Sequence, residues 1–401
     1  MNKQNRNVLS RLLSLALALA MVFACLVLPA SAAASNSDGS YDDLYRRYYY
    51  SHLDSKEKKA YRAIVKKLGD MPDRIQIPGS LTDTQLTDVF TAVSYDNPEF
   101  FMLSHSCSVA SSGGKYYFMP QYIMSRATYQ SGKRQIDSIV NNVVSNAKKK
   151  SNTYQKELYV HDWIVNRANY TYNGELKYCV YGCLINRQCN CEGYARTYQL
   201  ILNKLGIRNH LMTGYGFNVT GQQEQNGEGP HMWNVVTLNG NEYNCDLTWD
   251  DSDSGITFLF FNLPSGVSAA PSHAYFLRST SVMKRNHKGD GNNEFVWNGA
   301  IDDSQNYFRH YKLFYSAYDS AAKKNMTNWL IKKAKKGSKS VEFMFSSQSV
   351  YNKAKRGLFD NHELIQLVKN ANKSLPDGKK LNSSVTYSYD EAMYVIRIYL
   401  K

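Results

Sequence analysis

Two cysteines one residue apart precede a stretch with helical character in QCNCEGYARTYQLILNKLG, residues 188–206. The apolar spacing over 194–205 predicts a helix, and Gly193 permits a tight turn just before it. Cys191 then lies at the N-terminus of this helix, where unpaired N–H groups and the helix dipole favour a thiolate. Its own backbone N–H could also face a developing oxyanion. Cys191 is therefore the candidate nucleophile of a thiol enzyme.

A histidine and an aspartate that could complete such a site lie in GPHMWNVVTLNGNEYNCDLTWDD, residues 229–251. The central Asn239-Gly240 pair predicts a two-residue type I′ hairpin turn, which pairs Leu238 with Asn241. The register that follows from this turn decides which side chains share a face of the sheet.

Counting outward from the turn pairs Trp233 with Asp246 and His231 with Thr248. Because cross-strand partners share a face, Asp246 becomes the diagonal neighbour of His231, about 7–8 Å away between backbones. An imidazole oriented by a carboxylate on the next strand is what a Cys-His-Asp site requires. A one-residue bulge in the hairpin would move Asp246 to the opposite face and break this arrangement.

The motifs CEGYARTYQLILNKLGI, HMWNVV and NCDLTWDD together resemble the three motifs of the transglutaminase-like superfamily, in its bacterial secreted branch. The resemblance covers roughly residues 96–287, and the C-terminal region matches only in general character. Further segments are similar to those that accompany the domain: DNPEFF (96–101), YVHDWIVNRANY (159–170), FLFFNLP (258–264) and His287.

The resemblance implies a role for each residue of the candidate site. Cys191 takes the position of the nucleophile, His231 that of the general base and acid, and Asp246 that of the orienting carboxylate. The implied fold is papain-like, with a cysteine-bearing helix packed on an antiparallel sheet that carries the histidine and aspartate. The implied activities are protein cross-linking through glutamine acyl groups and peptide hydrolysis.

Three neighbours of the triad are further candidates for contact with a substrate. Gln188 and Asn190 are candidate oxyanion donors because they lie close to Cys191 in sequence. Trp233 shares the face of His231, and packing beside the site is the simpler interpretation of this residue.

Six cysteines remain once an N-terminal leader is removed. Four of them, at 179, 183, 189 and 191, have gaps of three, five and one residues, which are not the paired C-x2-C knuckles of structural zinc sites. In an exported chain we instead expect disulfides among Cys179, Cys183, Cys189 and Cys245. If Cys191 is a working thiol, at least one of the other five cysteines stays free, and the disulfide pattern of these five, Cys107 included, is left open.

An acidic run, DDSDSG (250–255), has some of the character of a calcium loop. Its glycine is out of register and no glutamate follows at the required distance, so we interpret it as a solvated loop. We therefore expect no metal ligands and no cofactor.

The first 32 residues have the pattern of a secretory signal peptide. Three basic residues precede an apolar run over 12–28, and Ala30-Ser31-Ala32 is an A-x-A cleavage site. No later stretch is long and apolar enough to span a membrane. We expect a secreted, extracellular protein, associated with the cell wall.

The chain is strongly basic. Removal of residues 1–32 takes away three positive charges and no acid, so the formal net charge falls from +14 to +11. Such a charge is typical of binding to anionic surfaces, and an anionic cell-wall polymer is the expected partner, with no specific nucleic acid. A basic cluster at the end of a predicted helix (Lys332, Lys333, Lys335 and Lys336) is either a contact for that polymer or solvated surface.

The patterns predict an α+β fold with three regions after the signal peptide: a mainly helical region with one hairpin (41–150), a transglutaminase-like catalytic core (151–300) and a C-terminal α+β region (301–401). Helices are expected at 56–68, 86–93, 136–144, 158–165, 194–205 and 321–336, and two short ones later. Strands are expected at 208–216, 231–238, 242–249 and 341–345, with hairpins around 111–114 and over 385–400.

The sequence thus predicts a secreted thiol enzyme that acts on peptide or protein amide bonds through a thioester intermediate. Hydrolysis is slightly favoured over amine transfer, since nothing marks a glutamine-and-lysine substrate pair. The alternatives are a cross-linking transglutaminase and, in another class, a non-catalytic cell-surface module for peptide binding or adhesion.

Overall fold

The computed structural model describes residues 47–217, 228–251, 271–290, 297, 299–382 and 384–400. Residues 44–401 form one compact unit. The predicted signal peptide, the FLFFNLP segment and most of the acidic run at 250–255 lie outside the described residues. Within the described ranges, no helix combines the length and the apolar character needed to cross a membrane.

The N-terminal region places three helices beside a small antiparallel sheet with strand order β1-β3-β2. The predicted helices at 56–68 and 86–93 are present but begin earlier, at Ser55 and Asp83. Asp54 and Glu57 form a capping box at the first start, and Thr82 and Gln85 form another at the second. The elements are α2 (Tyr48–His52), α3 (Ser55–Leu68), α4 (Asp83–Asp96), β1 (Ile75–Ile77), β2 (Leu103–Ser112) and β3 (Lys115–Tyr122).

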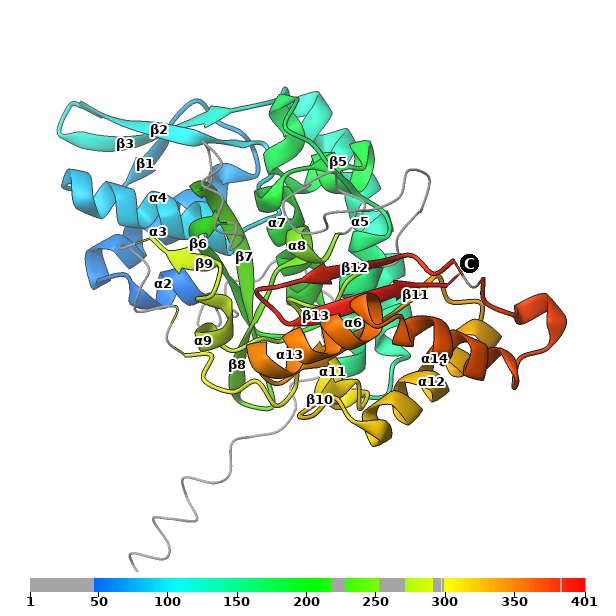
Figure 1. Cartoon of the computed structure of the whole chain (residues 1–401). Coiled ribbons are helices and arrows are strands. Elements are labelled where there is room, and N and C mark those ends of the chain that lie inside the picture. Colours follow the sequence, from blue (N-terminus) through cyan, green and yellow to red (C-terminus); the bar gives the residue numbers. More distant parts are fainter. Residues whose placement is uncertain are drawn as a thin grey trace, which may run out of the picture. The chain divides into compact units, whose positions relative to one another are not determined.

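The central region has a second antiparallel sheet, with strand order β8-β7-β6-β9, and three long helices, of which α7 packs on the sheet and α5 and α6 pack on α7 (Figure 1). The helix that begins at Cys191 lies against β6 and β7, as a papain-like core requires. The helices are α5 (Arg126–Lys148), α6 (Thr153–Val165), α7 (Cys191–Lys204), α8 (Leu247–Asp250) and α9 (Thr280–Met283). The strands are β4 (Asn169–Tyr170), β5 (Gln188–Cys189), β6 (Asn209–Phe217), β7 (Glu228–Leu238), β8 (Asn241–Cys245) and β9 (His287–Gly289).

The hairpin between β7 and β8 has the predicted register. Asn239 and Gly240 both have positive φ, as a type I′ turn needs, and Leu238 pairs with Asn241 without a bulge. The predicted extension of the second strand to residue 249 is wrong. The strand stops at Cys245 because the Asp246 side chain accepts the N–H groups of the next turn and starts α8.

The C-terminal region is a mixed sheet with strand order β10-β11-β13-β12 and helices α12 and α13 packed on β11 (Figure 1). The predicted helix, strand, short helices and final hairpin are all present. They are α12 (Ser320–Lys335), β11 (Ser340–Phe345), α13 (Gln348–Lys355), α14 (Glu363–Asn372), β12 (Tyr387–Asp390) and β13 (Val395–Tyr399). The structure adds α11 (Tyr307–His310) and β10 (Phe314–Tyr315), which the sequence did not predict.

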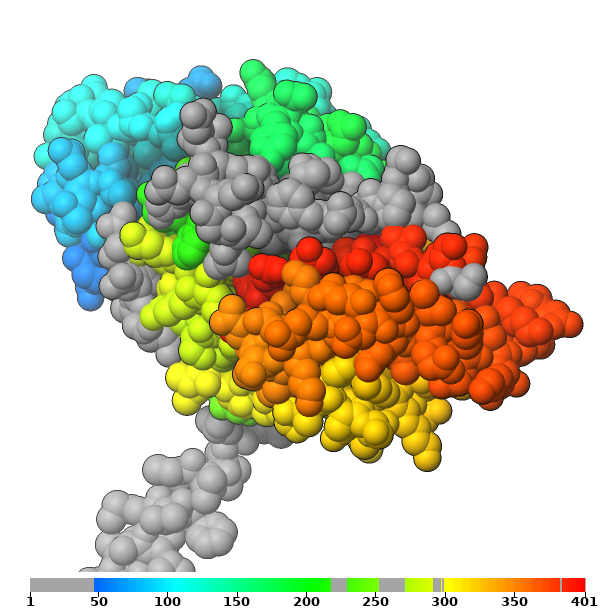
Figure 2. Space-filling model, viewed as in Figure 1, coloured from blue at the N-terminus to red at the C-terminus, as the bar shows by residue number. Residues whose placement is uncertain are grey.

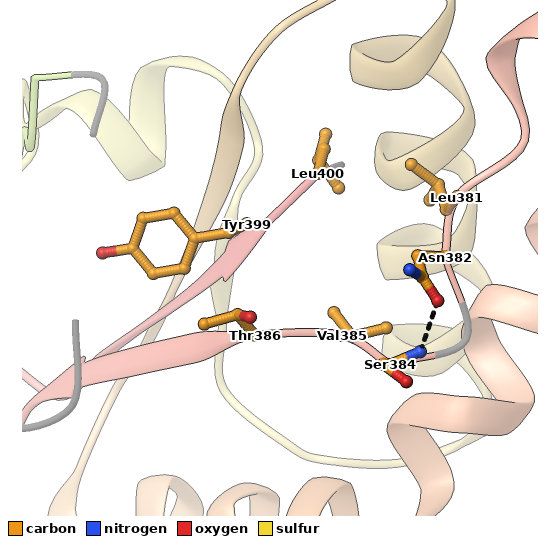
Figure 3. A pocket seen from close by; sticks show the side chains of 7 residues that line it. All are labelled: Leu381, Asn382, Ser384, Val385, Thr386, Tyr399 and Leu400. Atoms are coloured by element: carbon orange, nitrogen blue, oxygen red, sulfur yellow. Dashed lines mark hydrogen bonds between the residues drawn. The ribbon is translucent and has the colours of Figure 1, made fainter. Parts of the chain in front are cut away.

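A small hollow lies beside the end of the last hairpin, between Leu381–Asn382, Ser384–Thr386 and Tyr399–Leu400 (Figure 3). The Ser384 N–H donates to Asn382 Oδ1 at 2.9 Å across its mouth. Its volume of about 10 Å³ has room for no more than about one water molecule, so it is a packing defect rather than a ligand site.

The predicted α+β class is confirmed by this mixture of helices and mainly antiparallel sheets. The central and C-terminal regions are joined by buried polar contacts: Ser272 Oγ donates to Glu342, and Tyr275 Oη donates to Asp390. In Figure 2 the C-terminal region, orange to red, continues the yellow surface of the residues before it. The boundaries at residues 150 and 300 therefore stay predictions, because the structure shows one unit across them.

Candidate active site

Cys191 is the first residue of α7 and is 9% exposed. The Asn190 side chain caps the helix by accepting the Gly193 N–H at 3.3 Å. The first amides of a helix have no partner within it, so they and the helix dipole favour negative charge on the Cys191 sulfur. The thiol packs in a small cluster with Ala195 and strand residues Leu211 and Met232.

His231 projects from β7 and reaches both Asp246 and Cys191. Its Nε2 lies 2.6 Å from Asp246 Oδ2, and its ring is hydrogen-bonded to the Cys191 thiol. Because Nε2 is taken by the carboxylate, the other ring nitrogen is the one that faces the sulfur. The structure thus brings together the three residues that the sequence analysis selected.

Asp246 is 1% exposed and is held by four hydrogen bonds. Oδ1 accepts the backbone N–H groups of Thr248 at 3.0 Å and Trp249 at 3.2 Å. Oδ2 lies near Nε2 of two histidines, His231 and, at 3.0 Å, His287. One carboxylate therefore caps α8 with one oxygen and orients imidazoles with the other.

The buried pair of His231 and Asp246 is strongly coupled electrostatically. Burial alone would lower the pKa of His231, but the charge of Asp246 and the hydrogen bonds to Asp246 and Cys191 outweigh it and raise this pKa to about 10. Burial would raise the pKa of Asp246, yet the charge of His231 and the bonds from both histidines hold it below its usual range. The pair is thus an imidazolium and a carboxylate at neutral pH.

The comparison with protein families matches the segment that carries Cys191, His231 and Asp246. Residues 137–246 match the family model described as the transglutaminase-like superfamily. This segment is a transglutaminase-like core domain.

Two curated relatives match part of this chain. The kyphoscoliosis peptidases of Mus musculus and Homo sapiens are each 29% identical to this chain over 117 residues. The match covers 27% of this chain and 16% of each peptidase. The crystal structure of a TGase aligns with 57% of this chain and 61% of its own, at 14% identity and a TM-score of 0.25, a value too low to support a conclusion.

The other predicted site residues of the transglutaminase-like domain have different surroundings. Gln188 is exposed on the short strand β5. The carbonyl of the Asn190 side chain is used as the helix cap. Trp233 is 1% exposed and donates its indole N–H to Asn244 Oδ1 at 3.0 Å, so that N–H is not available as an oxyanion donor. Trp233 instead stacks on the His231 ring, with centroids 5.9 Å apart.

Gly193 does not form the tight turn that we predicted, because the helix already begins at Cys191. A glycine is needed there for close packing. A Cβ at this position would lie 2.5 Å from both the Cys189 Cβ and the Lys177 carbonyl oxygen. The segment before the helix therefore touches its first turn, which positions Cys191.

Sequence reasoning assigned no role to three residues that surround the triad. His287 contacts Asp246, and burial lowers the pKa of His287, so its ring is neutral. Trp249 packs beside the rings of both His231 and His287, with centroids 5.6 and 4.4 Å away. Burial and the nearby Cys191 raise the pKa of Tyr170. The only signal for these three residues in the sequence was the family resemblance, which included His287 and the motifs that contain Trp249 and Tyr170. Local spacing gives no signal for His287, whose contact with Asp246 spans 41 residues.

The cysteines do not form the disulfides that we expected. The six cysteines within the described residues are all free thiols. Cys189 is buried and hydrogen-bonded to Cys183, and burial raises the pKa of the Cys189 thiol well above its usual value. Cys245 accepts the Leu277 N–H at 3.4 Å in a separate part of the core. These thiols contribute packing rather than cross-links.

Proposed function

We propose that this protein is a thiol enzyme that cleaves amide bonds in peptides or proteins through Cys191, His231 and Asp246. The observation that carries the proposal is that the His231 ring is hydrogen-bonded both to the Asp246 carboxylate, through Nε2, and to the Cys191 thiol. A carboxylate-oriented imidazole beside a thiol at a helix N-terminus is the arrangement that activates a cysteine nucleophile.

The proposed reaction has two steps. The Cys191 sulfur attacks the amide carbonyl carbon, the electron pair moves to the oxygen, and the amine leaves with the proton of His231. The thioester is then attacked by water, one proton of which passes to His231, and the carboxylic acid product leaves as the Cys191 thiolate and the His231 imidazolium are restored. Asp246 stabilises the imidazolium in both steps and fixes the orientation of the ring.

Hydrolysis is favoured over amine transfer as the second step. The curated relatives that match this domain are named peptidases, although the chain covers only 16% of each.

We further propose that the enzyme is exported and held near the cell wall. The N-terminal pattern of basic residues, apolar run and A-x-A site supports export. Lys332, Lys335 and Lys336 lie exposed at the end of α12, where they could contact an anionic polymer.

Product analysis tests the proposed reaction. The protein without residues 1–32 is incubated with a mixed peptide library, with and without an added primary amine, and the products are examined by mass spectrometry. We expect cleaved peptides in both samples, lost in Cys191→Ala and kept in the control Cys107→Ala, whose thiol lies away from the site on β2. Ligated amine products alone would show a transferase. If the wild-type protein forms no product either with or without the added amine, the result would support a non-catalytic binding module.

A further inference from the structure

A second cluster of chemically active side chains lies outside the triad, on α6 and on the segment that precedes α9. His161 and Asp162 are neighbours on α6, and His273 approaches them from the segment that precedes α9. His161 Nδ1 and His273 Nε2 both lie 3.0 Å from the same oxygen, Asp162 Oδ1. The three ligand atoms lie within 4.8 Å of one another.

The outer nitrogen of each histidine is held by a different buried carboxylate. His161 Nε2 lies 3.1 Å from Asp250 Oδ2, and His273 Nδ1 lies 3.4 Å from Glu342 Oε2. Metal-binding histidines commonly donate their second N–H to a carboxylate, which turns the other nitrogen toward the ion. Both imidazoles show this arrangement, with their inner nitrogens directed at Asp162.

The packing fixes these rings in place. His161 is fully buried, and the His273 ring stacks on Tyr307 with centroids 3.8 Å apart and the planes inclined by 8°. Glu342 is in turn held by Arg397 at 2.7 Å. The donors are therefore preorganised by residues from the central and C-terminal regions, as a metal site requires.

One side of the cluster is open. The Asp162 side chain is 40% exposed and lines a hollow of about 430 Å³ with Trp163, Asn166, Arg167 and Arg187. An ion bound by the three donors would thus have a free position for water or another ligand. Two imidazole nitrogens, one carboxylate oxygen and an open position are a donor set that suits Zn²⁺ and related transition metals.

We propose that His161, Asp162 and His273 bind a divalent transition-metal ion, with Zn²⁺ as the representative ion. Ligand atoms around tetrahedral zinc, with bonds of about 2.0–2.1 Å, lie about 3.3 Å apart. The two contacts of 3.0 Å are a few tenths of an ångström shorter, so small side-chain movements admit the ion.

The proposal departs from the sequence analysis, which expected no metal ligands. His273 lies 111 residues from Asp162, so no local spacing marks the site. A similar group, His231, Asp246 and His287, also has metal-like spacing. There the carboxylate and His231 already serve Cys191, and aromatic rings enclose the group.

Metal titration of the Cys191→Ala protein tests the proposal, since this parent lacks the reactive thiol that could itself bind zinc. After removal of metal with a chelator, Zn²⁺ binding is measured by calorimetry and Co²⁺ binding by visible absorption. We expect about one equivalent to bind, and Asp162→Asn to weaken binding at least about tenfold. The control Asp137→Asn, an exposed carboxylate on α5, should bind as the parent does.

A second variant guards against misfolding. His273→Gln removes a ligand that is not fully buried, and circular dichroism should show that it and Asp162→Asn remain folded. Loss of binding in either folded variant supports the site. The proposal is overturned if the parent binds no stoichiometric metal, if both folded variants bind as tightly as the parent, or if His287→Gln alone abolishes binding. Charge-transfer bands of a cobalt thiolate would also overturn it by assigning the metal to a cysteine.

Discussion

Asp246 combines two tasks that are usually given to separate residues, because each of its oxygens has its own set of donors. Oδ1 accepts two backbone N–H groups of α8, and Oδ2 accepts from two imidazoles. The two hydrogen bonds to Oδ1 fix the carboxylate relative to the backbone. The hydrogen bond between Oδ2 and His231 then orients the His231 ring. The neutral ring of His287 adds a donor without adding charge.

Replacement of His287 tests whether this second imidazole matters for the site. His287→Ala removes one hydrogen bond to a buried carboxylate, a contact worth about 1.5–3 kcal/mol, so we expect kcat to fall about 10- to 100-fold with little change in KM. His287→Gln can still donate an N–H and should recover part of the loss. Unchanged kcat in a folded His287→Ala enzyme would show that Asp246 is positioned by α8 alone.

The His231–Asp246 pair predicts a defined dependence of stability on pH. The pKa of His231 is raised from 6.5 to about 10, so its contribution is complete below pH 6.5 and is lost as the pH rises toward 10. The pKa of Asp246 is lowered from 3.8, so its contribution is complete above that value and is lost as the pH falls further. The pair therefore stabilises the fold most between about pH 4 and 6.5.

Urea unfolding across this range measures the effect. The difference in free energy of unfolding between the wild type and His231→Gln should be largest near pH 5–6 and should shrink as the pH rises toward 10. The exposed pair Lys133–Asp137, removed by Asp137→Asn, should give no such trend near pH 7–9. A difference that stays constant from pH 6 to 10 would contradict the raised pKa of His231.

At the scale of elements, helix α7 and the β7–β8 hairpin position the site, and both were predictable from local patterns. The apolar stripe and the cap residues indicate helices, and Asn239-Gly240 sets the hairpin register. The predicted extension of the second strand to residue 249 was wrong, because a helix cap there outweighs the strand pattern. Strand-forming residues at 247–249 are turned into α8 by the side chain of Asp246, a capping choice that strand periodicity does not reveal.

The cap of α7 gives a prediction at this scale. Asn190→Ala removes the acceptor for the Gly193 N–H and should lower the free energy of unfolding by about 1 kcal/mol. Because the first turn carries Cys191, the same change should slow thiol labelling. Asn190→Ser keeps a capping oxygen and should retain most of the stability and most of the labelling rate of Cys191. Urea unfolding measures the first and the alkylation rate measures the second. Equal behaviour of Asn190→Ala and the wild type would rule out a role for the cap.

At the scale of the whole molecule, the central region depends on contacts from far along the chain. Glu342 on β11 accepts from Ser272 and lies near His273, and Asp390 accepts from Tyr275. Tyr275 in turn accepts from Asn286, the neighbour of His287. The contacts of Glu342 and Asp390 span 69 to 115 residues, and single-sequence patterns carry no signal for them. For the same reason, the sequence predicted the triad but not its surroundings.

Truncation tests this dependence and the predicted boundary at residue 300. A chain of residues 33–300 lacks Glu342 and Asp390, so Ser272 and Tyr275 lose their carboxylate partners. The truncation also exposes the face of the central region that packs on the C-terminal sheet. We expect it to lose cooperative unfolding and Cys191 reactivity, whereas residues 33–401 should keep both. A folded, reactive 33–300 fragment would show that the central region is an independent domain.

The alkylation rate of Cys191 tests the central claim most directly. The protein without residues 1–32 is treated with limiting iodoacetamide, and labelling of each cysteine is followed by mass spectrometry from pH 5 to 10. The account predicts that Cys191 reacts much faster than a free thiol in solution at pH 6–7, and that His231→Ala removes this advantage without changing the slow labelling of Cys107. A Cys191 that reacts no faster than the free thiol, or equally fast without His231, would contradict the account.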